Sequence, residues 1–140
     1  MSITGYSTKT ITLESAQAAV AAGVAAAAGM GIPMSVVVVD AAGQPKAAAR
    51  MDGASILSHE VAWRKAWTAA VTGAPTAGVH QFVASDAGSL ISMPQIPGFT
   101  VVAGGLPLQA DGSTLGAIGV SGATAELDLQ VATAALAALG

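Results

Sequence analysis

The stretch from Pro33 to Gly53 constrains the fold of this chain more than any other. Met34–Val39 is an apolar, β-branched run that ends in Asp40, and Gly43 follows shortly after, which is the pattern of a strand and a turn. A second short strand, about Lys46–Arg50, is expected to return antiparallel to the first. Four consecutive valines favour a strand buried on both faces. The stretch therefore predicts a covering layer on each side of this hairpin.

The segments before and after this hairpin predict the rest of the architecture. We expect helices at 13–28, capped by Thr12, at 55–72, at 77–84 and, capped by Thr124, at 125–139. We expect further strands at 99–102, 106–110 and 114–121, and a long irregular segment at 86–97. The order α-β-β-α-α-β-β-β-α predicts an α+β fold, an α/β sandwich, formed by residues 1–140 as a single domain. Its sheet is predicted to have five antiparallel strands, with helices on both faces.

The composition limits the kinds of partner that the chain can have. Apolar residues make up 53% of its 140 residues and charged residues only 9%, against about 25% in a typical domain. So few charges leave apolar surface exposed, which predicts a homo-oligomer. A net charge of −3 with only five Lys and Arg argues against nucleic acid. No segment reads as a membrane span or a secretory signal, and cysteine is absent, so we expect a cytoplasmic protein.

Several short motifs occur in order along the chain: ITLESAQ (11–17), PMSVVVVDAAGQ (33–44), RMDGA (50–54), GGLPL (104–108) and GAIGVSG (116–122). Together they resemble the GlcG/HbpS family, which includes the C-terminal domain of the PduO type. The resemblance implies a profilin-like or PAS-like sandwich and oligomers from dimers upward. For several members it also implies haem or corrinoid-linked roles, so haem is the cofactor expected here. Haem-binding members share no single axial ligand, and the resemblance assigns none to this chain.

Glu60 is the sharpest candidate for catalysis. Helical projection places it on one face with four apolar side chains, Ile56, Trp63, Trp67 and Val71. A carboxylate desolvated by indoles has a raised pKa and can accept a proton near neutrality. The competing interpretation is an ion pair between Glu60 and Arg64 at a solvated helix edge.

The two histidines are candidates for a ligand, a base or a surface role. His59 adjoins Glu60 and is interpreted as a second catalytic candidate, as a haem ligand, or as a side chain packed on Trp63. His80 lies on the short third helix. The two are too far apart in sequence for a helical zinc motif, and no cysteine assists them, so no metal site is predicted.

A ligand site is expected between the second helix, the 50–54 junction and the 86–106 segment. Arg50 and Asp52 either hold a ligand carboxylate or pair with each other, and the backbone N–H groups of Gly104 and Gly105 offer an oxyanion site. Lys65 points away from the tryptophans, so we expect it to make a structural or inter-subunit contact. The full set of predicted ligand-binding residues is Arg50, Asp52, Trp63, Arg64, Trp67, His80, Gly104 and Gly105.

Three hypotheses of function follow. The first is an oligomeric GlcG/HbpS-like protein that binds haem or another small ligand. The second is a small enzyme, without a tightly bound organic cofactor, in which Glu60 or His59 moves a proton on a carbonyl- or epoxide-like substrate. The third is a structural or regulatory subunit whose apolar surface serves assembly.

Overall fold

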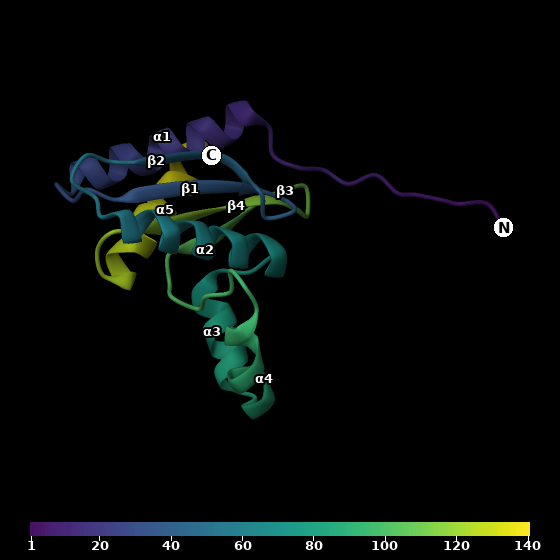
Figure 1. Cartoon of the computed structure of the whole chain (residues 1–140). Helices are drawn as coiled ribbons and strands as arrows, with labels where there is room; N and C mark the ends of the chain where they lie inside the picture. The colour runs from purple at the N-terminus through teal and green to yellow at the C-terminus, as the bar shows by residue number, and fades with distance from the viewer.

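The computed structural model describes residues 1–140 and contains four β-strands, five α-helices and one 3-10 helix. Figure 1 shows their arrangement. In chain order they are α1 (Leu13–Gly29), β1 (Ser35–Asp40), β2 (Pro45–Arg50), α2 (Ile56–Thr72), α3 (Thr76–Ala84), α4 (Ala87–Ser92), η1 (Met93–Gln95), β3 (Gly105–Ala110), β4 (Ser113–Ser121) and α5 (Ala125–Leu139).

The sheet is antiparallel throughout, with the strand order β2-β1-β4-β3. β1 and β4 are therefore the central strands, and in their register Val36 lies opposite Val120 and Val38 opposite Ile118. The four valines of β1 are at most 1% exposed. Because neighbouring side chains on a strand point to opposite faces, each face of the sheet receives two of these valines.

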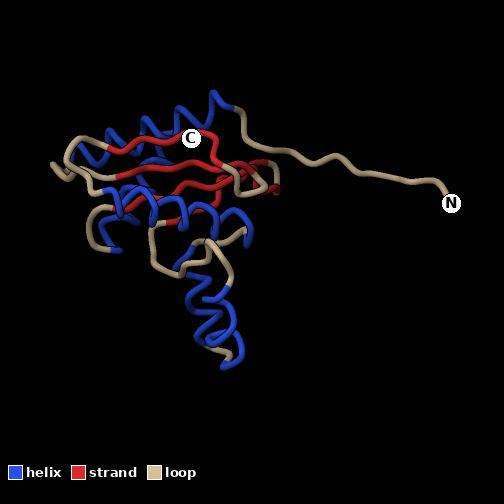
Figure 2. Tube along the Cα trace, viewed as in Figure 1, coloured by secondary structure: helices blue, strands red, loops and turns tan.

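Helices cover both faces of the sheet, as predicted (Figures 1 and 2). α1 and α5 pack on the face that carries Val36, Val38, Ile118 and Val120. α2 packs on the opposite face, where the buried cluster comprises Val37, Val39, Ala62, Ala66, Ala69, Ala70 and Ala117. The predicted covering layers are confirmed. None of the helices has both the length and the apolar character that a membrane span requires.

Hydroxyl side chains begin the three long helices. Thr12 Oγ1 accepts the N–H of Ser15 at 3.1 Å, and Thr124 Oγ1 accepts that of Leu127 at 3.2 Å, so both predicted caps are confirmed. Ser55 caps α2 in the same way. α2 ends at Gly73, whose φ of +68° favours glycine. The hydrogen bonds to Thr12, Ser55 and Thr124 satisfy backbone N–H groups that have no partner within the first turn of a helix.

The predicted fifth strand at 99–102 is wrong, because the sheet has four strands. Thr100 in this segment donates its N–H to Thr68 Oγ1 of α2 at 3.0 Å, and the same hydroxyl donates to the Gly98 carbonyl at 3.3 Å. The segment is therefore attached to a helix through one side chain, not to a strand through a ladder. A short apolar run cannot distinguish these two settings from sequence alone.

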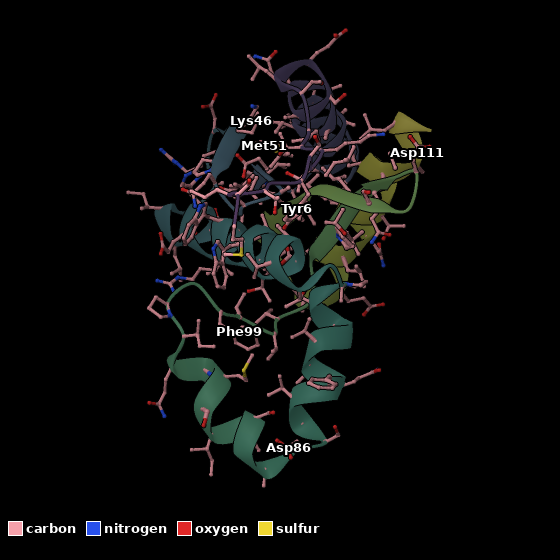
Figure 3. The ribbon with its side chains drawn as sticks, turned by 90° about the vertical axis from the view of Figure 1, so that its right-hand side faces the viewer. Tyr6, Lys46, Met51, Asp86, Phe99 and Asp111 are labelled. Carbon is pink, nitrogen blue, oxygen red and sulfur yellow. The ribbon has the colours of Figure 1, made fainter.

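The segment 86–97, predicted to be irregular, contains α4 and η1. Asp86 begins α4, since its Oδ2 accepts the N–H of Ser89 at 2.8 Å, and this bond holds the pKa of the Asp86 carboxyl below its usual value. Residues 76–97, called the α3–α4 hairpin below, project from the body beneath α2 (Figures 1 and 2). Figure 3 shows Asp86 at the tip of this hairpin and Phe99 near its base.

The buried face of α2 is not the predicted aromatic face. Ile56 is 80% exposed and Val71 47%, whereas the residues that face the sheet are small. A Cβ at Gly119 of β4 would overlap the backbone of Ala62 and Ala66. The backbones of α2 and β4 therefore approach closely, and only small side chains fit between them. Packing distance, rather than side-chain hydrophobicity, selects the buried face.

Candidate functional site

The structure places Glu60 and Arg64 in contact on the outer face of α2. Arg64 Nε donates to Glu60 Oε1 at 2.9 Å, and the two side chains are 42% and 56% exposed, respectively. The geometry is that of an i,i+4 ion pair at a solvated helix edge, which contributes only about 0.3–0.5 kcal/mol. His59 is exposed beside it. Within one chain, the desolvation on which the acid–base hypothesis depends is absent.

Trp63 and Trp67 are half-buried and lie over two glycines from distant loops. A Cβ at Gly98 would come within 3.2 Å of the Trp67 ring and 3.6 Å of the Trp63 ring. A Cβ at Gly43, in the β1–β2 turn, would lie 2.6 Å from the Trp67 ring. Trp67 therefore joins the β1–β2 turn to the loop before β3. These contacts give Trp67 a packing role within one chain, and its contact with a ligand stays a prediction.

Arg50 and Asp52 do not form the predicted ion pair. Arg50 Nη1 donates instead to the Ala54 carbonyl at 2.9 Å, and both Arg50 and Asp52 are exposed. The arginine thereby ties the end of β2 to the start of α2. Its remaining guanidinium donors are available to solvent or to a ligand.

Gly104 and Gly105 are buried against α2 and α3. The Gly105 N–H donates to Thr76 Oγ1 at 3.1 Å, and the Gly104 carbonyl accepts the Val120 N–H at 3.0 Å. A Cβ at Gly104 would meet Lys65 Nζ at 2.9 Å. These internal contacts explain the glycine pair by tight packing, and the Gly105 donor is already used within the protein.

Lys65 forms an ion pair in the interior of the protein, and the sequence analysis did not identify its partner. Its Nζ donates to Asp128 Oδ2 of α5 at 2.7 Å and to the Val120 carbonyl of β4 at 2.9 Å. The Lys65 and Asp128 side chains are 0% and 3% exposed, and Asp128 Oδ1 also accepts the Ala123 N–H at 3.0 Å. Burial lowers the pKa of Lys65, opposed by the adjacent Asp128 carboxylate. This is the structural contact predicted for Lys65.

A sequence signal for this pair does exist. Lys65 falls at helical spacing with Ala62 and Ala69, both fully buried, so it belongs to the sheet-facing stripe. Asp128 lies in the first turn of α5, where an acidic residue is common whether or not it has a buried partner. Nothing in the spacing of residues 65 and 128 indicates that they meet.

His80 lies at the edge of an apolar groove. The groove has a volume of about 370 Å³ and runs between α3, the 101–103 segment and the start of α5. Its lining consists of Ala77, His80, Val101, Val102, Ala103 and Ala125. His80 is the only residue in that lining with a nitrogen donor atom for a metal. No group of three or more His, Cys, Asp or Glu side chains gathers anywhere in the structure, so neither histidine belongs to a metal-binding cluster of that kind.

The structure therefore divides the predicted site residues into separate places. Glu60, Arg64 and the tryptophans share the outer face of α2, and neither Glu60 nor His59 lines the His80 groove. Arg50 and Asp52 lie at the β2–α2 junction, and the glycine pair lies in the interior. The groove beside α3 combines apolar lining with a potential metal ligand.

Comparison with known proteins gives one consistent family. A family model described as "Haem degrading protein HbpS-like" matches residues 11–137. The chain is 34% identical over 109 residues to PduO, a corrinoid adenosyltransferase of Salmonella typhimurium. This match covers 77% of the chain but 32% of PduO, so the chain spans about a third of that relative's length.

Solved structures agree with this assignment. A double mutant of Streptomyces reticuli HbpS is 38% identical, with a TM-score of 0.89 and coverage of 100% of this chain and 96% of the other. A PduOC:haem complex is 29% identical, with a TM-score of 0.84 and coverage of 92% and 94%. Because the family model spans nearly the whole folded body and the relatives share its architecture, this chain belongs to the HbpS-like family.

Proposed function

We propose that this chain binds haem and that the His80 groove is the binding site. The observation that carries the proposal is the lining of the groove, a single imidazole among alanine and valine side chains. A haem needs apolar contacts for its macrocycle and a donor atom for its iron, and histidine is a common axial ligand. The groove volume of about 370 Å³ lies within the ~300–1,000 Å³ range of ligand pockets.

The family relationship supports haem as the ligand. The family description names haem degradation, and the PduOC relative has been solved as a haem complex. In this chain, the His80 imidazole would hold the iron. Ala77, Val101 and Val102 would contact the macrocycle. Bound haem would supply an iron centre for ligand binding or electron transfer.

A haemin titration tests this proposal. We expect wild-type protein to shift and sharpen the Soret band of haemin, and His80→Ala to weaken binding at least about tenfold, the effect of losing ~1.4 kcal/mol. His59→Ala is the matched control, since it removes an exposed histidine outside the groove. Equal haemin affinity in wild type and His80→Ala would show that His80 is not the ligand. Absence of any spectral shift would remove haem binding altogether.

Acid–base catalysis by Glu60 or His59 stays a separate prediction. The Glu60 carboxylate is paired with Arg64 and is 56% exposed, which suits a surface role better than a general base. Under the haem proposal, Glu60→Gln leaves haemin affinity unchanged. A variant that loses turnover of a carbonyl or epoxide substrate, with its melting temperature preserved, would favour the catalytic hypothesis instead.

We also propose that the protein is a homo-oligomer. Only 9% of its residues are charged, and many large apolar side chains are exposed in the isolated chain. Exposed apolar surface of this kind marks interaction sites. Sedimentation equilibrium of the wild type tests this statement, and a monomer mass at every concentration would contradict it.

A further inference from the structure

The α3–α4 hairpin carries large apolar side chains that the isolated chain leaves in solvent. Phe82 is 71% exposed, Leu90 56%, Ile91 69% and Ile96 42%. These four side chains are called the hairpin surface below. They come from the part of the molecule that projects away from the sheet and its helices (Figures 1 and 2). Single exposed apolar residues need no explanation, but four within a short segment indicate a contact surface.

The α4 half of the hairpin is not buried against the rest of the chain. None of the residues of α4 is buried, and α4 is six residues long. Helices much shorter than about 12 residues are marginal in water without tertiary packing. The Asp86 cap satisfies only one donor at the start of α4. Packing of Leu90 and Ile91 against another surface would provide the burial that α4 lacks within one chain.

The charge of this region narrows the choice of partner. Between residues 73 and 104, Asp86 is the only formally charged side chain, and there is no Lys or Arg. Nucleic acid and anionic membranes are recognised through clustered cations, so neither matches this surface. A charged protein partner would find no complementary groups here. The surface suits an apolar, nearly uncharged partner.

We propose that the hairpin surface packs against the hairpin surface of a second copy of this chain. A two-fold contact requires a patch that is complementary to itself, and a nearly uncharged patch meets its own copy without like-charge repulsion. The hairpin also offers a hollow of about 340 Å³, lined by Thr72, Ala74, Gly78, Val79, Phe82, Val83 and Met93, which can receive apolar side chains of the second copy.

This inference specifies the surface of the proposed homo-oligomer and does not depend on haem. His80 also lies on α3, so a second copy seated on the hairpin would stand next to the His80 groove. If the protein binds haem but stays monomeric, the proposal of the His80 groove stands and the proposed contact between hairpin surfaces is wrong. The two proposals therefore fail separately.

Sedimentation equilibrium with charge variants tests the contact. We expect Ile91→Lys and Ile91→Glu each to weaken association of the full chain about 100-fold, because each places a charge in an apolar interface. Mixing the two variants should restore association if Ile91 lies near the two-fold axis. Ile56→Lys is the matched control, since Ile56 is 80% exposed on α2, outside the hairpin. Unchanged association of both Ile91 variants, or loss of association only in Ile56→Lys, would overturn the proposal.

A cross-linking experiment covers the case in which a charge variant fails to fold. The chain has no cysteine, so one introduced thiol is the only reactive thiol in each molecule. Ser92→Cys, at the exposed end of α4, should give a covalent dimer with a short bismaleimide, whereas Ser15→Cys on α1 should not. Equal cross-linking of the two variants, or none in Ser92→Cys, would contradict the proposed contact.

Discussion

The sheet-facing side of α2 and the α3–α4 hairpin use apolar residues in opposite ways. α2 meets the sheet through Ala62, Ala66 and Ala69, which are fully buried. The hairpin holds Phe82 and Ile91, which are larger and mostly exposed. Hydrophobicity alone would place the larger side chains inside and the alanines outside. The structure does the reverse in these two regions.

The reason lies in the distance between α2 and β4. Gly119 of β4 lets the backbone of the sheet approach that of α2 directly, since a Cβ at this position would collide with the backbone of Ala62 and Ala66. Such close packing stabilises through many short contacts between small groups. Large apolar side chains excluded from this layer gather outside it. The layer between α2 and the sheet is therefore closed mainly by alanines, while the large apolar side chains of the hairpin stay exposed and are available for partners.

The largest expected effect comes from the charged pair within this interior. Lys65→Met leaves the Asp128 carboxylate buried without its cation, and we expect a loss of about 3–5 kcal/mol in the free energy of unfolding. Urea denaturation measures it. The double variant Lys65→Met/Asp128→Asn should recover most of the loss, because Asn keeps an acceptor for the Ala123 N–H. Equal stability of wild type and Lys65→Met would mean that the pair does not anchor α2 to α5.

The next largest effect comes from replacing a buried isoleucine of the sheet by alanine, compared with the same replacement in the hairpin. Ile118→Ala removes a fully buried side chain from the sheet and should cost about 2–5 kcal/mol. Ile91→Ala removes a side chain that is 69% exposed and should change the stability of the monomer by less than about 0.5 kcal/mol. The free energy of unfolding of the monomer is measured in dilute protein. In concentrated protein, Ile91→Ala should lower the free energy of unfolding further if the hairpin is an interface. A large loss of stability for Ile91→Ala in dilute protein would mean that Ile91 packs within its own chain.

A pair of glycine substitutions sharpens the argument from packing distance. Gly119→Ala introduces a methyl group against the backbone of Ala62 and should cost about 1–3 kcal/mol. Gly78→Ala in α3 meets no atom within 4 Å and should stabilise the helix by about 0.5–1 kcal/mol. Thermal melting of both variants should show shifts of opposite sign. A neutral Gly119→Ala would contradict the close approach of α2 and β4.

The smallest effect is a pH dependence at alkaline values. Burial lowers the pKa of Lys65 in the folded state, so between that pKa and the unfolded value of about 10.4 the unfolded chain binds more protons. The free energy of unfolding should therefore rise with pH in this window, relative to Lys65→Met/Asp128→Asn, which lacks the titrating amine. Below the window the two slopes should agree. A relative fall in stability toward pH 10 would mean that the pKa of Lys65 is raised.

Local sequence patterns were enough to predict most of the fold. The valine run and the hydroxyl caps each act within a few residues, so the structures that they form depend little on the rest of the chain. The strand prediction for the segment 99–102 was wrong because the conformation of this segment depends on a hydrogen bond to Thr68, which is distant in sequence. α4 was missed because the segment 86–97 contains Gly88, Pro94 and Pro97, which are typical of irregular structure.

The candidate site was harder to predict, for a related reason. The buried face of α2 was predicted from the hydrophobicity of its side chains, and the close approach of β4 reversed that assignment. The partner of Lys65 and the lining of the His80 groove both join segments that are far apart in sequence. His80 was recognised as a candidate by its chemistry, but its apolar surroundings appeared only when α3, the 101–103 segment and α5 were brought together.

The central claim is that the functional surface lies along α3 and not on the tryptophan face of α2. Amide spectra of labelled protein with haemin test it most directly, because the paramagnetic iron broadens nearby resonances and zinc protoporphyrin provides a diamagnetic control. The account predicts broadening centred on Ala77, His80 and Val101–Ala103. Broadening centred on His59, Glu60 and Trp63, with α3 unaffected, would contradict it.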